Sequence, residues 1–515
     1  MEQAPVTVGL GPVGFDEIVA VARQHAEVVI SEEAMTEVRR TRAVVEALAD
    51  DPEPHYGIST GFGALATRHI PVELRSQLQR SLIRSHAAGS GPEVEREVVR
   101  AMMLLRISTL ATGRTGVREQ TLRAYVALLN AGLTPVVHEY GSLGCSGDLA
   151  PLAHCALALM GEGAVRNRDG ALQSTADAFA ANGLSPVELA EKEGLALING
   201  TDGMLGMLVL AIADLRRLLT VADITAGMSV EGLLGTDDVF AADLHALRPH
   251  PGQAASAANL RLVMADSEIR ESHRTEACTR VQDAYSLRCS PQVAGAARDT
   301  VEYAAGVAAV ELSSAVDNPV ITRDGRVESN GNFHGAPVAY VLDFVAIVVA
   351  DLASIAERRT DRFLDRARNS GLHAFLADDP GVDSGHMIAQ YTQAAIVSEL
   401  KRLAVPASVD SIPSSAMQED HVSMGWQAGR KLRRAIDGLT RVLAIELLTA
   451  ARGLELRAPL RPSPASAAVI AALRSAGAPG PGTDRWMAPE IELAVELITS
   501  GAVVAAAEPV VGHLN

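Results

Sequence analysis

Aromatic residues, cysteines and positive charge are all scarce in this sequence. Phe, Trp and Tyr make up 3% of its 515 residues, so the core must consist mainly of aliphatic side chains. The four cysteines form no C-x-x-C pair and no histidine cluster has zinc spacing, so we expect no metal site. The formal net charge of −17 disfavours a nucleic-acid partner, because phosphate binding requires clustered Lys and Arg.

The beginning of the sequence shows no secretory-signal pattern, so we expect no secretory signal. The segment "MEQAPVTVGL" has no basic stretch followed by an apolar run, and reduced thiols fit the cytosol. The most apolar long segment, residues 337–359, carries Asp343 and Asp351 near its middle. Two carboxylates predict a buried helix and not a membrane span. We therefore expect a cytoplasmic protein without a membrane partner.

The hydrophobic residues that are present recur mostly with a helical period. Long helices are expected at residues 93–112, 116–131, 203–228, 296–316, 337–366, 386–404 and 421–453. Strand patterns are short and lie at residues 6–8, 27–30 and 318–331. The pattern predicts a mostly α fold with a mixed N-terminal domain at residues 1–200. A long central helical bundle with a C-terminal helical segment is predicted for residues 201–515.

The first motif, near the start of the chain, is a G-x-G-x-x-G match. Gly9, Gly11 and Gly14 follow a strand-like triplet and precede a helix, and Glu32 lies about twenty residues further on, as a dinucleotide fold requires. The alternation of strands and helices then stops, which favours a turn and helix cap. A nucleotide-binding oxidoreductase stays open as an alternative that cofactor binding would test.

The second motif is the loop "HEYGSLGCSGDLAPLAH" at residues 138–154. It is not a nucleophile elbow, because the last Gly of G-x-S-x-G is missing and no continuous strand leads into Ser146. A plain structural interpretation is a glycine turn followed by Asp148 as a helix cap, with Pro151 in the first helical turn.

The same loop has a second, chemical interpretation. Gly147 has no side chain, so its amide nitrogen can reach back to the carbonyl carbon of Cys145. Closing that bond makes a five-membered ring, and loss of the Ser146 hydroxyl as water leaves a methylidene group. The product is an imidazolone with an electron-poor alkene, an electrophile made without any metal or imported cofactor.

Two further loops place polar residues where backbone can approach a ligand. "HYGISTGFGAL" holds Tyr56 among Gly57, Gly61 and Gly63, although a half-buried tyrosine that anchors the loop fits equally. "SLIRSHAAGSG" places His86 near the end of a helix, where a structural histidine or a helix C-cap is the plain interpretation.

Two later segments supply a cation, an amide and a carboxylate. Gln282 and Tyr285 lie three residues apart, so they are predicted to share a helix face, and Arg288 follows within the same stretch. Glu419 precedes a long helix, where compensation of the helix dipole is its plain role.

Together these loops resemble the family of aromatic amino-acid ammonia-lyases and aminomutases. The resemblance runs in order from "YGISTGFG" through "GSLGCSGDLAPLAH", "EKEGLALINGTDGML", "VQDAYSLRC", "DNPVI" and "NGNFHGAPVA" to "MQEDHVSMG". It implies a mostly α fold, homotetramers whose active sites are shared between chains, and a 4-methylideneimidazole-5-one (MIO) group formed from Cys145, Ser146 and Gly147. That group would lie on the loop of the N-terminal domain.

Two pairs of residues resemble the members that act on histidine. Ser85-His86 stands where phenylalanine lyases tend to have Phe-Leu and tyrosine lyases His-Leu. Gln418-Glu419 stands where other members often show Asn-Gln-Asp. A carboxylate opposite an imidazole can accept its N–H in a charge-assisted hydrogen bond, whereas against a phenyl ring it would be buried without a partner.

The resemblance implies an elimination of ammonia from L-histidine that gives trans-urocanate. Tyr56 would be the base, which requires a pKa well below the ordinary value of about 10. Arg288 would bind the carboxylate of the amino-acid substrate. Asn199 and Gln282 would hold the oxygen of the prosthetic group and the reacting centre.

The remaining residues implied by the resemblance surround the substrate. Tyr285 and Phe333 would wall the site, His86 and Glu419 would position the imidazole, and Gly63 would bring loop backbone close to the ligand. A lyase or 2,3-aminomutase acting on tyrosine or another aromatic amino acid is the nearest alternative. A non-catalytic helical scaffold, recognisable by an uncyclised tripeptide, is the alternative from another class.

Three residues depart from the family pattern. Most members have Ala where this chain has Cys145, although some histidine lyases also have Cys. Met417 replaces the common Asn before Gln-Glu, and Asp202 stands where many histidine lyases have Gln.

Overall fold

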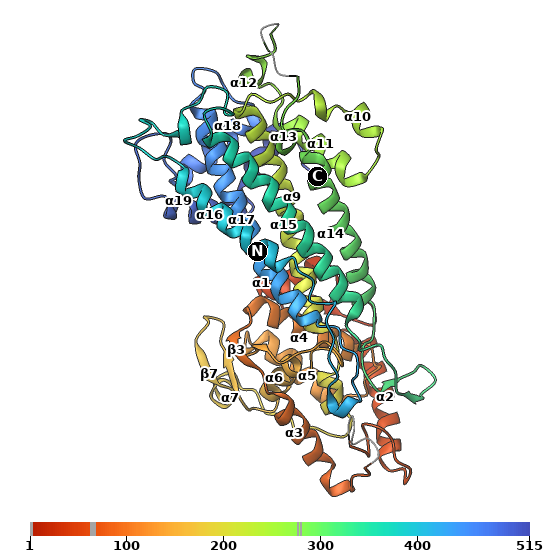
Figure 1. Ribbon diagram of the computed structural model, residues 1–515. Coiled ribbons are helices and arrows are strands. Elements are labelled where there is room, and N and C mark those ends of the chain that lie inside the picture. Colours follow the sequence, from red (N-terminus) through yellow and green to blue (C-terminus); the bar gives the residue numbers. More distant parts are fainter. Residues whose placement is uncertain (1–3, 62–67, 276–277, 279–280) are drawn as a thin grey trace. The chain divides into compact units, whose positions relative to one another are not determined.

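The computed structural model describes residues 4–61, 68–275, 278 and 281–515. Helices account for 59% of the chain and strands for 6%, so the predicted mostly α class is confirmed (Figure 1). The chain forms two compact units. The first unit comprises residues 1–210, 305–343 and 406–430, and the second comprises residues 211–304, 344–405 and 431–515. A domain boundary at residue 200 stays a prediction.

The first unit opens with a single strand–helix–strand element. Strands β1 (Val6–Val8) and β2 (Val28–Ile30) pair in parallel around α1 (Phe15–Gln24), and Gly14 caps that helix. In the described part of the chain this sheet has only these two strands. The glycine motif therefore serves as the turn and helix cap, and the doubly wound sheet that a dinucleotide fold requires does not form.

The centre of the first unit is α4 (Arg96–Ala111), whose residues from 98 to 111 are all buried. Its neighbours α1, α2 (Glu32–Ala49) and α5 (Glu119–Asn130) pack against it. A second group is formed by α3 (Arg75–His86), α6 (Leu149–Leu159) and α8 (Glu193–Ile198). The C-terminal ends of α3 and α8 and the N-terminal end of α6 line one cavity of this unit. Helix α7 (Thr175–Asn182) packs on a small sheet.

Three small antiparallel sheets complete the first unit. Strand β3 (Ser90–Glu93) pairs with β5 (His138–Tyr140), and β6 joins β4 to β7 in a sheet formed by Thr134–Pro135, Ala164–Arg166 and Leu172–Ser174. Strands β8 (Val320–Ile321) and β9 (Val327–Glu328) form the hairpin predicted for residues 318–331. The sequence analysis missed β5, which ends at Tyr140, and the chain between it and Ser146 is irregular.

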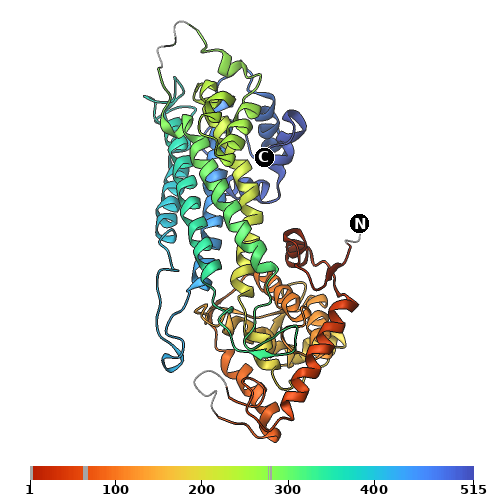
Figure 2. The ribbon, with the colours of Figure 1, turned by 90° about the vertical axis from the view of Figure 1, so that its right-hand side faces the viewer.

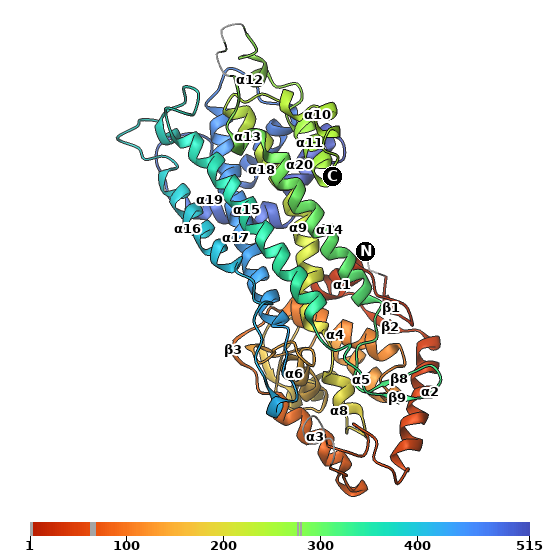
Figure 3. The same cartoon turned by 45° about the vertical axis from the view of Figure 1, so that its right-hand side comes forward.

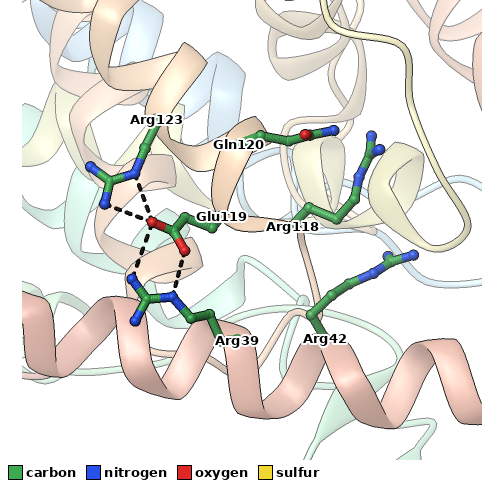
Figure 4. A pocket seen from close by; sticks show the side chains of 6 residues that line it. All are labelled: Arg39, Arg42, Arg118, Glu119, Gln120 and Arg123. Atoms are coloured by element: carbon green, nitrogen blue, oxygen red, sulfur yellow. Dashed lines mark hydrogen bonds and ion pairs between the residues drawn. The ribbon is translucent and has the colours of Figure 1, made fainter.

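An arginine-rich cavity of about 520 Å³ lies between helices α2 and α5 (Figure 4). Glu119, at the start of α5, accepts hydrogen bonds from Arg39 of α2 and from Arg123 one helical turn further along α5. Arg42 and Arg118 point away from this cluster, and each has its own glutamate partner. Ion pairing between these side chains connects the two helices at a partly exposed site.

The second unit is built from long helices and several shorter ones. Segments of α9 (Asp202–Gly232), α14 (Ser290–Leu312), α15 (Ala336–Leu364) and α17 (Gly425–Glu455) run side by side in all three views (Figures 1, 2 and 3). The shorter helices are α10 (Ala242–Ala246), α11 (Pro251–Val263), α12 (Glu268–Glu271), α13 (Tyr285–Arg288), α16 (Met387–Leu403), α18 (Pro464–Ala476), α19 (Ala488–Thr499) and α20 (Ala502–Val511). All seven long helices predicted from periodicity are present, with ends shifted by a few residues.

Two helical segments are long and apolar enough to cross a membrane by composition alone. They are residues 193–232 and 336–364, whose most apolar windows are 100% and 61% buried within the protein. Asp343 in α15 is buried and accepts a hydrogen bond from the backbone N–H of Ser408 at 2.7 Å. Burial against protein thus accounts for the hydrophobicity of residues 193–232, and for that of residues 336–364 in part.

Candidate active site

Two adjoining cavities in the first unit bring together residues from distant parts of the sequence. Their volumes are about 800 Å³ and about 520 Å³. Both are lined by Tyr56, Ser146, Asn318 and Glu419. The larger cavity adds an apolar wall and the ends of α3 and α8, and the smaller adds Cys145 and the segment that precedes α15. A few polar groups on an apolar wall are typical of small-molecule sites.

The tripeptide Cys145-Ser146-Gly147 lies in the turn that leads into α6. Gly147 has φ of +76°, a conformation that favours glycine. A Cβ at this position would lie 2.0 Å from the carbonyl oxygen of Gly200. That same oxygen accepts a hydrogen bond from the N–H of Asp148 at 2.7 Å. Only glycine fits here, because the loop is pressed against the backbone that follows α8.

The side chain of Asp148 anchors the loop and makes no capping hydrogen bond to α6. Its carboxylate accepts hydrogen bonds from the hydroxyl of Ser142 at 2.9 Å and from the N–H of Met204 at 2.9 Å. Burial raises the pKa of Asp148 to about 7. Asp148 occupies the N-cap position of α6, as predicted, but its side chain makes no capping hydrogen bond, because these two donors occupy the carboxylate oxygens. Pro151 does lie in the first turn of α6, as predicted.

Glu419 contacts the tripeptide directly. Its two carboxylate oxygens lie 3.3 Å from the Ser146 Oγ and 3.2 Å from the Cys145 Sγ. The helix α17 begins only at Gly425, so the predicted role in compensating the helix dipole is wrong. Burial, followed by the nearby Glu419, raises the pKa of the Cys145 thiol to about 12. The thiol is therefore an un-ionised neighbour of the carboxylate.

His86 is the last residue of α3 and faces the same cavity. Its Nδ1 lies 2.9 Å from the carbonyl oxygen of Leu82, so Nδ1 must carry the proton and Nε2 is left as a hydrogen-bond acceptor. Burial is the main reason that the pKa of His86 is lowered, and the charge of Glu419 opposes this shift. A neutral imidazole and a carboxylate thus line the same cavity.

Asn199, at the end of α8, is buried with one side-chain atom unused. Its Nδ2 donates to the carbonyl oxygen of Asn318 at 2.8 Å, which fixes the orientation of the amide. Its Oδ1 is buried and has no hydrogen-bond partner among the residues that the structure describes. A buried acceptor without a donor is unfavourable unless a ligand or prosthetic group supplies one.

Two buried ion pairs, which were not predicted from the sequence, lie near Asn199. Arg106 pairs with Asp202 at 2.8 Å and donates to the backbone carbonyl of Asn199 at 3.2 Å. Lys192 pairs with Asp317 at 2.5 Å, and both side chains are fully buried. Asp202, one of the three departures from the family pattern, is therefore a structural partner of Arg106. Charged residues inside apolar helical patterns were the signal that could have revealed these pairs.

Three other predicted residues are placed as follows. Tyr56 is half-buried in a turn and lines both cavities, and Phe333 is half-buried and lines the smaller one. Gly63 lies outside the described residues. Met417, another departure, is 69% exposed and is absent from the lining of both cavities.

Gln282, Tyr285 and Arg288 belong to the second unit. Tyr285 and Arg288 begin and end the short helix α13, and the Arg288 guanidinium lies over the Tyr285 ring at 4.8 Å. Gln282 precedes that helix, so the prediction that it shares a helix face with Tyr285 is wrong. The four-residue helix is too short to include a residue three positions earlier. Tyr285 is 72% exposed.

Sequence comparison places this site among enzymes. The aromatic amino acid lyase family matches residues 13–475. A histidine ammonia-lyase of Streptomyces avermitilis is 65% identical over 99% of both chains. One from Streptomyces coelicolor is 64% identical, again over 99% of both.

Solved structures agree on the fold. Tyrosine aminomutase from Streptomyces globisporus superposes with a TM-score of 0.93 at 36% identity, over 99% of this chain and 100% of that one. Histidine ammonia-lyase from Trypanosoma cruzi gives 0.90 at 37% identity, over 98% and 96%. A lyase and a mutase are thus equally similar in structure, and the shared property is the family. The chain belongs to the aromatic amino acid lyase family.

Proposed function

We propose that this protein is a histidine ammonia-lyase, which eliminates ammonia from L-histidine and releases trans-urocanate. The observation that carries the proposal is the pairing of His86 and Glu419 on the cavity that holds Ser146. Near-complete alignment with curated histidine ammonia-lyases at 64–65% identity supports it.

The prosthetic group in this proposal is MIO, formed from Cys145, Ser146 and Gly147. Three observations fit it: the glycine that no other residue could replace, the backbone pressed against Gly200, and the unpartnered Oδ1 of Asn199 beside the same cavity. The group supplies an electron-poor alkene that accepts an electron pair from the substrate. Asn199 would hold it in place.

The imidazole of the substrate would be held between His86 and Glu419. Because Nδ1 of His86 donates to Leu82, its Nε2 can accept an N–H from a substrate ring. The Glu419 carboxylate is a second acceptor, and a charge-assisted hydrogen bond to it favours an imidazole over a phenyl ring. The lowered pKa of His86 keeps its ring neutral and therefore able to accept.

Tyr56 is assigned as the base that takes the β-proton at its phenol oxygen. It lines both cavities together with Ser146, so a substrate bound there would lie within its reach. Phe333 would wall the same site. Gly63 is retained as a proposed contact through the backbone of its loop.

Gln282, Tyr285 and Arg288 are proposed to act in a homotetramer whose active sites are shared between chains. Arg288 would bind the substrate carboxylate bidentately, since a planar guanidinium matches the geometry of a carboxylate. The exposed Tyr285 ring fits a residue that an assembly would cover. A cytoplasmic location, without nucleic acid or membrane, completes the proposal.

A second candidate is a tyrosine ammonia-lyase or 2,3-aminomutase, which the match to the Streptomyces globisporus aminomutase favours. The two candidates differ at the ring-binding end of the cavity. A phenol ring carries no N–H, whereas an imidazole carries one and a protonated imidazole two, and His86 and Glu419 both provide acceptors for such a donor.

The test is incubation of the purified protein with L-histidine and, separately, with L-tyrosine. We expect urocanate absorbance to rise with histidine and no coumarate or β-tyrosine to accumulate with tyrosine. Turnover of tyrosine in preference to histidine would favour the second candidate. Turnover of neither, by a chain that lacks the ring, would favour a scaffold.

A further inference from the structure

We propose that Glu419 also catalyses the formation of the prosthetic group, as a proton shuttle in the dehydration of Ser146. This inference rests on the proposed function, because it concerns the origin of the ring. It assigns to Glu419 a task that precedes any encounter with substrate.

Glu419 contacts an atom that reacts when the ring forms. The Oε1 of Glu419 lies 3.3 Å from the Oγ of Ser146, the oxygen that must leave as water. Among the hydrogen bonds of the described residues, this is the one that the Ser146 hydroxyl makes. The two residues are 273 positions apart, so the contact is created by the fold and not by local sequence.

The carboxylate of Glu419 is held in place by its neighbours. The Ser414 hydroxyl donates to Oε2 of Glu419 at 2.9 Å, and the backbones of the two residues exchange hydrogen bonds at 2.8 and 3.3 Å. The Cys145 thiol donates to the same Oε2. Oε1 is therefore the oxygen left for the Ser146 hydroxyl.

Hydrogen bonds on both sides hold the tripeptide beside Glu419. The carbonyl of Gly144 accepts from the Ser423 hydroxyl at 2.8 Å and from the Gly335 N–H at 3.2 Å. On the other side, the Asp148 N–H is bonded to Gly200. Glu419 and the hydroxyl thus stay together while the ring forms.

The covalent steps balance with Glu419 as the only shuttle. Ring closure joins the Gly147 nitrogen to the Cys145 carbonyl carbon, and the carbonyl oxygen leaves as the first water with the amide protons of Gly147 and Ser146. The carboxylate of Glu419 then takes the Cα proton of Ser146. The electron pair of that C–H bond forms the double bond to Cβ, the Cβ–Oγ bond breaks, and Glu419 returns the proton to the departing hydroxyl. The second water leaves and the carboxylate is restored.

A general acid–base group is needed because hydroxide is a poor leaving group. A positioned side chain typically accelerates such a proton transfer by about 10²–10⁴-fold. The departure of the hydroxyl also removes the partner of Oε1. The same oxygen is then open to the imidazole N–H of a substrate, so completion of the ring prepares the binding site.

The experiment measures the mass of the chain as it matures. Wild-type, Glu419→Gln, Glu419→Asp and His86→Gln proteins are sampled at intervals after a pulse of synthesis. Glutamine keeps the shape of Glu419 but cannot carry the proton. His86→Gln is the matched control, because His86 lines the same cavity and bonds to Leu82 and Ser85 instead of to the tripeptide.

The expected result is that wild type and His86→Gln become lighter by two waters. Glu419→Gln should accumulate a species lighter by one water and lose the second at least tenfold more slowly, and Glu419→Asp should recover part of the rate. Loss of both waters by Glu419→Gln at the wild-type rate overturns the inference. Should Glu419→Gln be insoluble, Ser414→Ala replaces it, and an unchanged rate in that variant likewise overturns the inference.

The outcome for wild type separates this inference from the proposed function. A wild-type chain that loses no water lacks the ring, and the proposed prosthetic group fails with it. A wild-type chain that loses two waters, beside a Glu419→Gln chain that does so equally fast, leaves the prosthetic group intact and removes only the role of Glu419.

Discussion

Two cavities of the first unit are lined by polar side chains. In one cavity these side chains are paired with each other, and in the other some of their polar atoms are unused. In the arginine-rich cavity between α2 and α5, each guanidinium already has a glutamate partner. Arg39 pairs with Glu119 at 2.5 Å (Figure 4), and Arg118 pairs with Glu193 at 2.7 Å. In the larger cavity beside the tripeptide, Asn199 keeps a buried acceptor without a donor, and His86 keeps an acceptor nitrogen.

The difference distinguishes a cavity with a structural role from a cavity suited to ligand binding and catalysis. Charges that satisfy each other hold helices together and have little left to offer a ligand, and at an exposed site they stabilise the fold only slightly. Polar atoms left unused in an apolar-walled cavity are unfavourable until a ligand or prosthetic group arrives. Variants of the tripeptide cavity should therefore affect turnover most, and variants of the arginine-rich cavity should affect little.

The largest expected effect is that of Ser146→Ala. Without the hydroxyl the alkene cannot form, so turnover of L-histidine should fall by roughly 10³-fold or more, a part of the ~10⁶-fold minimum acceleration typical of enzymes. Initial rates of urocanate formation measure it. Turnover at the wild-type rate would reject the prosthetic group.

Tyr56→Phe should follow, with a loss in kcat of about 10²–10⁴-fold, the usual contribution of a general base. Since the phenol ring stays, the KM for histidine should change little. Tyr303→Phe, on an exposed position of α14, is the matched control and should keep full activity. A loss below tenfold would remove Tyr56 as the base.

Arg106→Met should affect stability rather than chemistry alone. It leaves Asp202 buried without its ion-pair partner, and burial already raises the pKa of that carboxyl. Breaking a buried pair typically destabilises by about 3–5 kcal/mol. Asp202→Asn in the same chain should restore part of the thermal midpoint, because the uncompensated charge is then gone. A double variant no more stable than the single one would contradict this explanation.

His86→Gln should change how stability depends on pH. Burial lowers the pKa of His86 below 6.5, so on acidification the unfolded chain takes up a proton first. The stabilising contribution is present above pH 6.5 and is lost as the pH falls from there toward the lowered pKa. The variant should therefore lose less stability than wild type below pH 6.5 in thermal melts. Parallel slopes for the two proteins would argue against a buried neutral ring.

The smallest effect is expected for Arg39→Met in the arginine-rich cavity. Glu119 keeps Arg123 as a partner at 2.6 Å, and the site is exposed to screening by salt. Melting temperature and turnover should both match wild type within error. A marked loss of turnover would mean that this cavity has a function beyond joining α2 to α5, and would break the comparison.

Much of the fold could be predicted because its signals are local. Helical periodicity predicted α9, α15 and α17 nearly to their ends, because apolar residues recur on one face of each consecutive turn. The strand β5 was missed because three residues beside glycines carry too little pattern. Gln282 was wrongly placed on a helix, because spacing alone does not show where a helix begins.

The candidate site was predicted as a set of residues but not as a geometry. Ser146 and Glu419 could each be selected from the sequence, but the plain interpretation of Glu419 was compensation of a helix dipole. Their contact depends on how the segment before α17 folds onto the turn before α6, which no local pattern encodes. Charged residues inside apolar patterns mark Arg106 and Asp202 as candidates for a buried ion pair, but their pairing depends on the same long-range folding and was not predicted.

The measurement that tests the central claim most directly is the mass of the peptide spanning residues 138–154 in the active, purified protein. The account predicts a peptide lighter by two waters than its sequence, with the missing atoms assigned to Cys145, Ser146 and Gly147. An unmodified peptide, in a preparation that converts L-histidine to urocanate at full rate, would contradict it.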